Sequence, residues 1–232
     1  MPAPAEGCVL AEVGAARSVS PVPRVTPTPL RLTSAAPPTA HGVHAPNAVD
    51  RQTAEDVALS PGDLGPRTPT QPGRPAEDFN GVLGTFHAYC DYYTPVVARC
   101  SGHRFVAYRT GGVAVGSDVS IFTGTGAADL VEGVRRSLRT CKAPLTVRDA
   151  RGTVLGVFAV TAAPAPSTVP TATTTLTYRR IDVAGPVTRA VFLQRGRVLS
   201  VVLTTGTESA SQRTLRLAVK RAALRLARAP AS

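Results

Sequence analysis

The sequence predicts an α+β fold, in which one domain builds a twisted antiparallel sheet with packed helices and follows a disordered N-terminal segment. Three observations predict this fold. Segments of alternating polar and apolar residues recur from residue 104 onward, as is typical of strands. Two segments with helical periodicity interrupt and close that series. The prolines gather early in the chain, where 14 of the 21 lie at or before Pro75.

Residues 1–55 are rich in Pro, Ala and Thr and hold few large apolar side chains. Such a composition cannot bury enough apolar surface to offset the entropy lost on ordering, so we expect this segment to be disordered. We place the folded domain at residues 56–228 and a short tail at residues 229–232. The first residues lack the basic and apolar regions of a signal peptide, and no apolar run of about 18 residues predicts a transmembrane segment.

The domain begins with a turn and an aromatic segment. Asp56–Pro66 contains Ser-Pro-Gly-Asp, which favours a first ordered turn, and a Pro-rich loop follows at Arg67–Pro75. From Asp78 to Cys100 the chain holds three of its five tyrosines and two of its six phenylalanines. We therefore expect this segment to contribute to the core.

A strand pair comes next. Arg104–Arg109 alternates with period two and predicts the first strand. Gly111–Gly112 predicts a turn, and Val113–Thr123 predicts the second strand. The Gly-Ser-Asp sequence inside that second strand indicates a bulge or a turn.

Two helices are predicted. Ala127–Cys141 has one apolar face, and Lys142 and Pro144 end it. That face consists of Leu130, Val134, Leu138 and Cys141. Ser209–Arg228 predicts the closing helix. Its apolar face consists of Leu215, Val219, Ala222 or Ala223, and Leu226.

The remaining strands lie between the two helices. Leu145–Arg148 and Thr153–Val160 predict a hairpin closed by Asp149–Gly152, and Ala162–Thr175 predicts a low-complexity loop. Three more strands are predicted, at Leu176–Ile181, Arg189–Gln194 and Val198–Thr205. The last two are joined by Arg195–Gly196, which suits a tight hairpin.

The charge of the chain admits two interpretations. A formal charge of +11 and a pI near 10.5 favour attraction to anions, whereas coding bias toward Arg and Ala gives the same excess without an anionic partner. The closing helix concentrates the basic residues Arg213, Arg216, Lys220, Arg221, Arg225 and Arg228. This set is a candidate surface for anionic lipid or phosphates. Alternatively, the helix packs on the sheet while its basic side chains face water, which we favour because the preceding hairpin needs a cover.

Candidate sites for chemistry are few. The aromatic residues Phe86, Tyr89, Tyr92 and Tyr93 form a candidate ligand cleft, or else ordinary core. His87, Asp91, Ser101 and His103 are the residue types of a hydrolase triad, but Ser101 lies in no G-x-S-x-G elbow. Gly124 and Gly126 before a helix lack the rest of a dinucleotide or P-loop motif. We expect no catalytic, cofactor or metal site.

The order of elements resembles a known family. The run Ser117–Pro144, then Thr175–Gly185, a Val-rich hairpin and a closing Ala/Arg/Leu helix resemble the actinobacterial sensor or lipoprotein domains related to the extracellular domain of the kinase PknH. Ala58–Pro66 resembles the start of these domains. The resemblance spans about residues 56–228. It implies an antiparallel sheet with flanking helices, an extracytoplasmic location and a disulfide-braced cleft for an unknown ligand.

On this resemblance we expect a non-enzymatic sensor-like or ligand-binding domain whose partner is a small ligand or a component of the cell envelope. The alternative is a basic interaction protein that binds nucleic acid or an anionic surface. Four cysteines, none in a C-x-x-C, favour a disulfide over zinc. The candidates are Cys141 with Cys90 or Cys100, or Cys90 with Cys100, while Cys8 lies in the N-terminal segment.

Overall fold

A computed structural model describes residues 47–65, 69–73, 79, 99–140, 144–148, 154–164 and 172–230. Disorder was predicted for residues 1–55. Residues 1–46 of that segment lie outside the described residues, so for them the disorder stays a prediction. The described residues form a single α+β domain, as predicted from the sequence.

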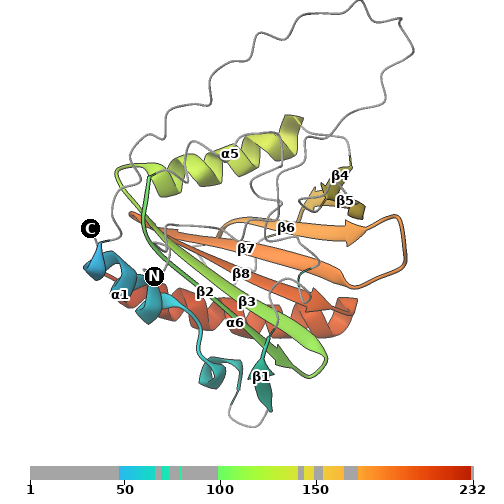
Figure 1. Cartoon of the computed structure of the whole chain (residues 1–232), viewed down its shortest axis with the longest axis horizontal. Coiled ribbons are helices and arrows are strands. Elements are labelled where there is room, and N and C mark those ends of the chain that lie inside the picture. The colour runs from blue at the N-terminus through green and yellow to red at the C-terminus, as the bar shows by residue number, and fades with distance from the viewer. Residues whose placement is uncertain are drawn as a thin grey trace, which may run out of the picture.

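Eight strands of the described chain form one antiparallel sheet in the order β1-β2-β3-β8-β7-β6-β5-β4. They are β1 (Thr70–Pro72), β2 (Cys100–Thr110), β3 (Val113–Phe122), β4 (Leu145–Arg148), β5 (Val154–Ala162), β6 (Ala172–Arg180), β7 (Val187–Arg195) and β8 (Val198–Gly206). The first hairpin, β2–β3, pairs with the last hairpin, β7–β8, through β3 and β8. The centre of the sheet therefore consists of two hairpins that are far apart in the sequence (Figure 1).

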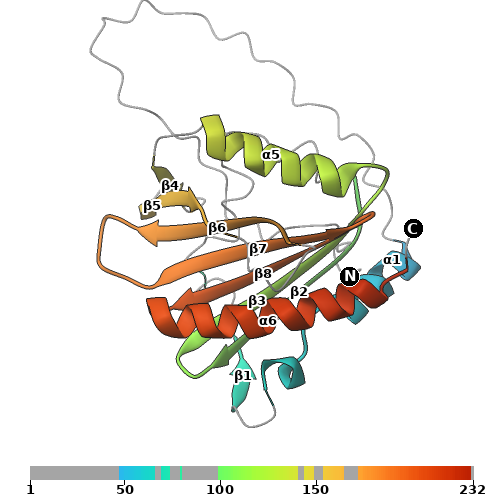
Figure 2. The ribbon, with the colours of Figure 1, turned by 180° about the vertical axis from the view of Figure 1, so that it is seen from behind.

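The helices cover both faces of the sheet. They are α1 (Ala48–Val57), the 3₁₀ turn η1 (Pro61–Leu64), α5 (Gly126–Thr140) and α6 (Glu208–Arg228). α1 and α6 share one hydrophobic cluster with Val115, Val119 and Ile121 of β3, whereas α5 shares another with Phe122. α6 lies behind the sheet in Figure 1 and in front of it in Figure 2. Side chains alternate between the faces of a strand, so one strand serves both clusters.

The central strands are buried along their whole length because both faces are covered. Every residue of β3 and β8 is buried, and so are the first seven residues of β7. Both strands accordingly contain a continuous apolar run, Ala190–Leu193 in β7 and Val201–Leu203 in β8, as in sheets covered on two sides. The tight turns are made by glycines in the left-handed region: Gly111 (φ 54°) and Gly112 (φ 75°) join β2 to β3, and Gly196 (φ 54°) joins β7 to β8.

The helix α1 begins within the segment predicted to be disordered. The side chain of Asn47 caps it by accepting a hydrogen bond from the backbone N–H of Val49 (3.0 Å). Asp50, Ala54 and Val57 are buried against the sheet. The described fold thus includes α1, and we propose that the domain starts before residue 56. This short helix was not predicted, because the composition of residues 1–55 taken together is typical of a disordered segment.

The bulge predicted inside the second strand is absent, because β3 pairs without a break with β2 from Val113 to Ile121. The irregularity lies instead in β2, between Cys100 and Gly102. Gly116 has a different role: a Cβ there would lie 2.9 Å from the ring of Phe79, so glycine permits the close approach of that ring. The predicted loop Ala162–Thr175 was also too long, since β6 already begins at Ala172.

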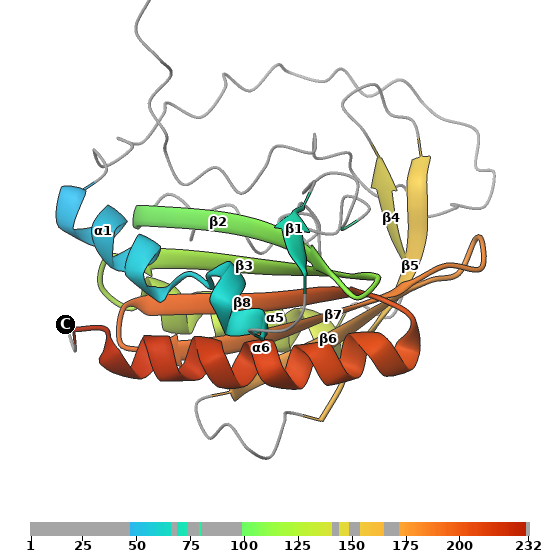
Figure 3. The same cartoon turned by 90° about the horizontal axis from the view of Figure 1, so that it is seen from below.

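α6 lies along one face of the sheet, as Figure 3 shows from below, and hydrogen bonds from β7 hold both of its ends. Near its start, the buried Arg189 of β7 bonds to Glu208 and lies 3.4 Å from the hydroxyl of Ser211. At its end, Arg195 donates to the carbonyl oxygens of Leu226 (3.1 Å) and Ala227. A cation at this end also favours the helix dipole. The buried face of α6 consists of Ser211, Leu215, Ala218, Val219, Ala222 and Leu226, close to the predicted face.

Candidate functional site

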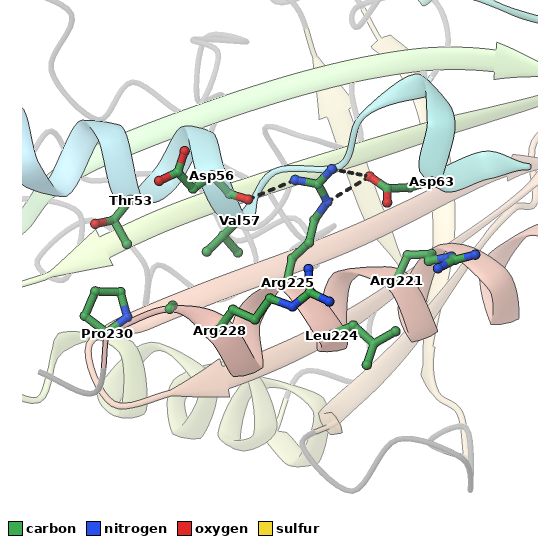
Figure 4. A pocket seen from close by; sticks show the side chains of 10 residues that line it. Thr53, Asp56, Val57, Asp63, Arg221, Leu224, Arg225, Arg228 and Pro230 are labelled. Atoms are coloured by element: carbon green, nitrogen blue, oxygen red, sulfur yellow. Dashed lines mark hydrogen bonds and ion pairs between the residues drawn. The ribbon is translucent and has the colours of Figure 1, made fainter.

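A groove lies between α1, η1 and the C-terminal half of α6, with a volume of about 400 Å³ (Figure 4). It is lined by Thr53, Asp56, Val57, Asp63, Arg221, Leu224, Arg225, Arg228, Ala229 and Pro230. Its two walls come from the two ends of the described chain. They meet because α1 and α6 pack on the same face of the sheet.

Arg225 crosses between the walls and fixes their separation. Its Nε donates to Asp63 Oδ2 (2.8 Å), its Nη2 to Ser60 Oγ (2.9 Å), and its Nη1 to the backbone oxygen of Asp56 (2.9 Å). The side chain is 28% exposed, against 16% for Asp63. Arg225 was predicted as part of a basic surface. In the structure its side chain instead points into the groove and forms a brace, a set of hydrogen bonds that links α6 to α1 and η1.

Asp63 holds the other end of this brace. Its Oδ2 also accepts hydrogen bonds from the backbone N–H and the hydroxyl of Ser60, both at 2.8 Å. Burial by itself would raise the pKa of Asp63, but the bonds from Ser60 and Arg225 outweigh it and lower the pKa below the usual value of 3.8. Asp63 is therefore ionised at neutral pH and committed to the guanidinium of Arg225.

Two further arginines line the groove without such a partner. Arg221 and Arg228 are exposed, and neither forms a hydrogen bond or ion pair with another described residue. The accessible apolar surface beside them comes from Leu224 (45% exposed), because Val57 and Ala229 of the lining are buried. Guanidinium groups match the geometry of carboxylate and phosphate oxygens. The groove thus offers positive charge beside a small apolar surface.

The groove holds few groups suited to bond-making chemistry. None of its lining residues is His, Cys or Ser. The carboxylate of Asp63 is occupied by Arg225, and that of Asp56 accepts a hydrogen bond from Gln52 (2.9 Å). Within the described residues there is also no cluster of three or more His, Cys, Asp or Glu side chains that would hold a metal ion. The arrangement suits recognition of an anion.

A second polar feature lies on the opposite face of the sheet. Nε2 of His103 is 2.9 Å from Oδ1 of Asp118, and these side chains are 16% and 4% exposed. Ser117 and Val119 face α1 and α6. Because side chains alternate along a strand, Asp118 between them faces α5. Burial lowers the pKa of His103, but the charge and hydrogen bond of Asp118 outweigh burial and raise the pKa above 6.5.

Ser101 and His103 do not come together as parts of a hydrolase triad. The hydroxyl of Ser101 donates to Oδ2 of the buried Asp50 in α1 (2.5 Å). Nη2 of Arg197, from the β7–β8 turn, donates to the same oxygen (2.7 Å). Ser101 therefore faces α1, whereas His103 pairs with Asp118 on the other side. The Asp50–Ser101–Arg197 network fastens α1 to the sheet.

Several predicted site residues fall outside the described residues. They are Phe86, Tyr89, Tyr92 and Tyr93 of the candidate cleft, together with Cys90 and Cys141. Cys100 opens β2 and is 7% exposed, whereas Cys90 and Cys141, its predicted disulfide partners, lie outside the described residues. The predicted pairing therefore stays a prediction. Arg213, Arg216 and Lys220 lie exposed on α6, outside the groove.

Sequence reasoning missed the wall of the groove that α1 and η1 provide. Thr53 was assigned to the disordered segment, and Asp56, Val57 and Asp63 were assigned only to a first turn. One signal was present: Asn47 before a helical turn that carries Asp50 in its first residues is a typical helix start. The contact with α6 itself has no local signal, since Asp63 and Arg225 are far apart in the sequence.

Comparison with known proteins identifies a likeness of fold. No protein-family model matches the sequence, and a search of curated proteins finds no match. Among solved structures, the chain is similar to the crystal structure of the extracellular domain of PknH from Mycobacterium tuberculosis, with a TM-score of 0.50 and 14% identity. The match covers 77% of this chain and 98% of that chain. The resemblance noted in the sequence is thus confirmed as a resemblance of structure.

None of the helices that the structure describes has an apolar stretch long enough to cross a bilayer.

Proposed function

We propose that this chain is a non-enzymatic ligand-binding domain of the sensor type, and that its groove takes a small molecule carrying a carboxylate or a phosphate. One observation carries the proposal: Arg221 and Arg228 line a preformed groove without a described acidic partner. An anionic group placed between them replaces water on two guanidinium groups, and Leu224 contacts the apolar part of the same molecule. Arg225 keeps the walls in place, so little ordering is needed on binding.

The sensor assignment is supported by the fold. The match covers 98% of a domain described as the extracellular domain of PknH, so the described chain corresponds to that whole domain. Fold alone does not determine function, because unrelated activities share folds. The proposal therefore takes the sensor class from the likeness and the ligand class from the groove.

An extracytoplasmic location belongs to the same proposal. The likeness to an extracellular domain supports it. A disulfide at Cys100 belongs to the same proposal, because structural disulfides persist mainly in oxidising compartments. The disulfide partner is proposed to be Cys90 or Cys141. Membership of the actinobacterial, lipoprotein-type group rests on the sequence resemblance.

Isothermal titration calorimetry of the full chain tests the groove. The probes are butyl phosphate and hexanoate, which combine one anionic group with a short apolar chain, and butanol serves as the neutral control. We expect saturable binding of at least one anion and none of butanol. In the variant R221Q/R228Q the affinity falls at least about tenfold, because two charge-assisted contacts are lost.

The matched control is R135Q/R139Q, which removes the same charge from α5 on the other side of the sheet. Both residues are exposed and pair only weakly with Glu132, at 3.9 Å and 3.0 Å. The control variant should bind like the unmodified chain. An equal loss of affinity in both variants would mean that net charge, rather than the groove, attracts the anion.

A further inference from the structure

We propose that the outward side of α6 docks on the surface of an anionic lipid bilayer. This side is called the outer stripe of α6 below, and it consists of Arg213, Arg216, Leu217, Lys220 and Leu224. The proposal goes beyond ligand binding, and all but Leu224 of these residues lie outside the groove.

The geometry of the helix separates the outer stripe from the core. The buried residues of α6 turn toward the sheet, and successive residues are rotated by about 100°. Leu217 and Leu224 therefore lie on the side away from the sheet, where Figure 2 shows α6 as the outermost layer. They are 36% and 45% exposed. Since they are about two turns apart, both leucines lie along one line, about 10 Å from each other.

The charge of this face has one sign. Arg213, Arg216 and Lys220 are exposed and form no hydrogen bond or ion pair with another described residue. Arg221 and Arg228 continue the basic face toward the groove. No acidic residue follows Glu208 in the chain. The repulsion among these cations is relieved when they approach an anionic surface.

The two exposed leucines select lipid among the anionic partners. On nucleic acid the basic side chains would meet phosphates, but Leu217 and Leu224 would gain no apolar contact. At a bilayer surface the basic side chains meet lipid phosphates while apolar side chains enter the boundary with the acyl chains. A basic helix with leucines between its cations fits this second surface. Because α6 is fastened at both ends to the sheet, it needs no ordering on contact.

Co-sedimentation of the full chain with vesicles tests the proposal. One set of vesicles contains equal parts of phosphatidylcholine and phosphatidylglycerol, and the other contains phosphatidylcholine alone. We expect binding to the first set, much weaker binding to the second, and a decrease as salt is added. The variant R213E/K220E should lower the partition coefficient more than about tenfold, because each basic residue near an anionic surface contributes about fivefold.

Two matched controls separate the outer stripe from net charge and from general apolar exposure. R135E/R139E makes the same charge change on α5, at residues 43% and 64% exposed, and should bind nearly as the unmodified chain does. L217S/L224S should weaken binding severalfold. I181S/V183S, which replaces residues 50% and 51% exposed in the β6–β7 loop, should not. Circular dichroism of each variant checks that it remains folded.

Three results would overturn the proposal. Equal losses in R213E/K220E and R135E/R139E would mean that only net charge acts. Equal binding to both kinds of vesicle would exclude an anionic surface as the partner. Salt-sensitive binding to a DNA duplex that L217S/L224S leaves unchanged, together with no binding to vesicles, would assign the basic face to nucleic acid. Anion binding in the groove, measured on R213E/K220E, is independent of these outcomes because Arg213 and Lys220 do not line the groove.

Discussion

Individual arginines of this chain have different roles, although the sequence presents them as one basic excess. Arg189, Arg195 and Arg197 hold helices on the sheet through carboxylates or carbonyl oxygens, and Arg225 joins α6 to α1 and η1. Arg213, Arg221 and Arg228 lie exposed without a described partner. Only the contacts in the folded structure distinguish an arginine that joins two elements from an exposed arginine that is available to bind an anion.

At this scale the network of Asp50 gives a direct prediction. Asp50→Ala leaves Arg197 and the hydroxyl of Ser101 without their shared acceptor. We expect the free energy of unfolding, measured by urea titration, to fall by about 2 kcal/mol, less than for a fully buried pair because Arg197 is partly exposed. Arg179→Ala breaks an ion pair whose residues are 59% and 57% exposed and should cost at most about 0.5 kcal/mol. Similar losses in the two variants would contradict the assigned role of Asp50.

The pair of His103 and Asp118 predicts a pH dependence of stability. Asp118 raises the pKa of folded His103 above the unfolded value of 6.5. The stabilisation is therefore complete below the unfolded pKa and is lost as the pH rises through the folded pKa. We expect His103→Gln to destabilise the chain more at about pH 5.5 than at about pH 8.5. Urea titrations at both pH values measure the loss in free energy of unfolding. An equal loss at both would show that the charge of His103 does not contribute to stability.

Among the elements, α1 depends on the absence of a side chain at Gly102. A Cβ at this position would lie 2.5 Å and 2.6 Å from the backbone carbon and oxygen of Asp50, so α1 has to move away from β2. Gly102→Ala should lower the free energy of unfolding by about 1–3 kcal/mol. Gly62→Ala, where nothing lies within 4 Å, should change it by less than about 0.5 kcal/mol. Equal effects in thermal unfolding would show that α1 does not pack closely on β2.

The elements also show what the sequence predicts and why. The face of α6 was predictable because Leu215, Val219 and Leu226 recur with helical period and need cover. The helix α1 was missed because its inward residues are small, and because its partners lie on strands about fifty residues further on. The bulge in β3 was predicted wrongly, since Gly116 serves the packing of Phe79, a contact that no local pattern records.

For the whole molecule, a sheet covered on both faces makes the position of the domain boundary testable. A chain of residues 46–232 contains all of α1, whereas a chain of residues 56–232 loses Asp50 and Ala54 and exposes the strands beneath. We expect the shorter chain to be less stable by about 3 kcal/mol or more, as seen in urea titration. Equal stability would restore residue 56 as the start of the domain.

The groove is a property of the whole molecule, which explains why the sequence did not reveal it. Its walls are α1 with η1 and the end of α6, and each wall by itself has an ordinary pattern. They meet only because the β2–β3 and β7–β8 hairpins pair at the centre of the sheet. The class of fold followed from periodicity, which is local, whereas the site follows from topology.

Mapping of butyl phosphate by NMR tests the central proposal most directly. In ¹⁵N-labelled full chain, we predict saturable shifts of the backbone amides of Thr53, Val57, Arg221 and Arg228 around the groove. The amides of His103 and Asp118, on the opposite face of the sheet, should not move. Shifts confined to that opposite face, or no saturable shift in the groove, would contradict the assignment of the groove as the ligand site.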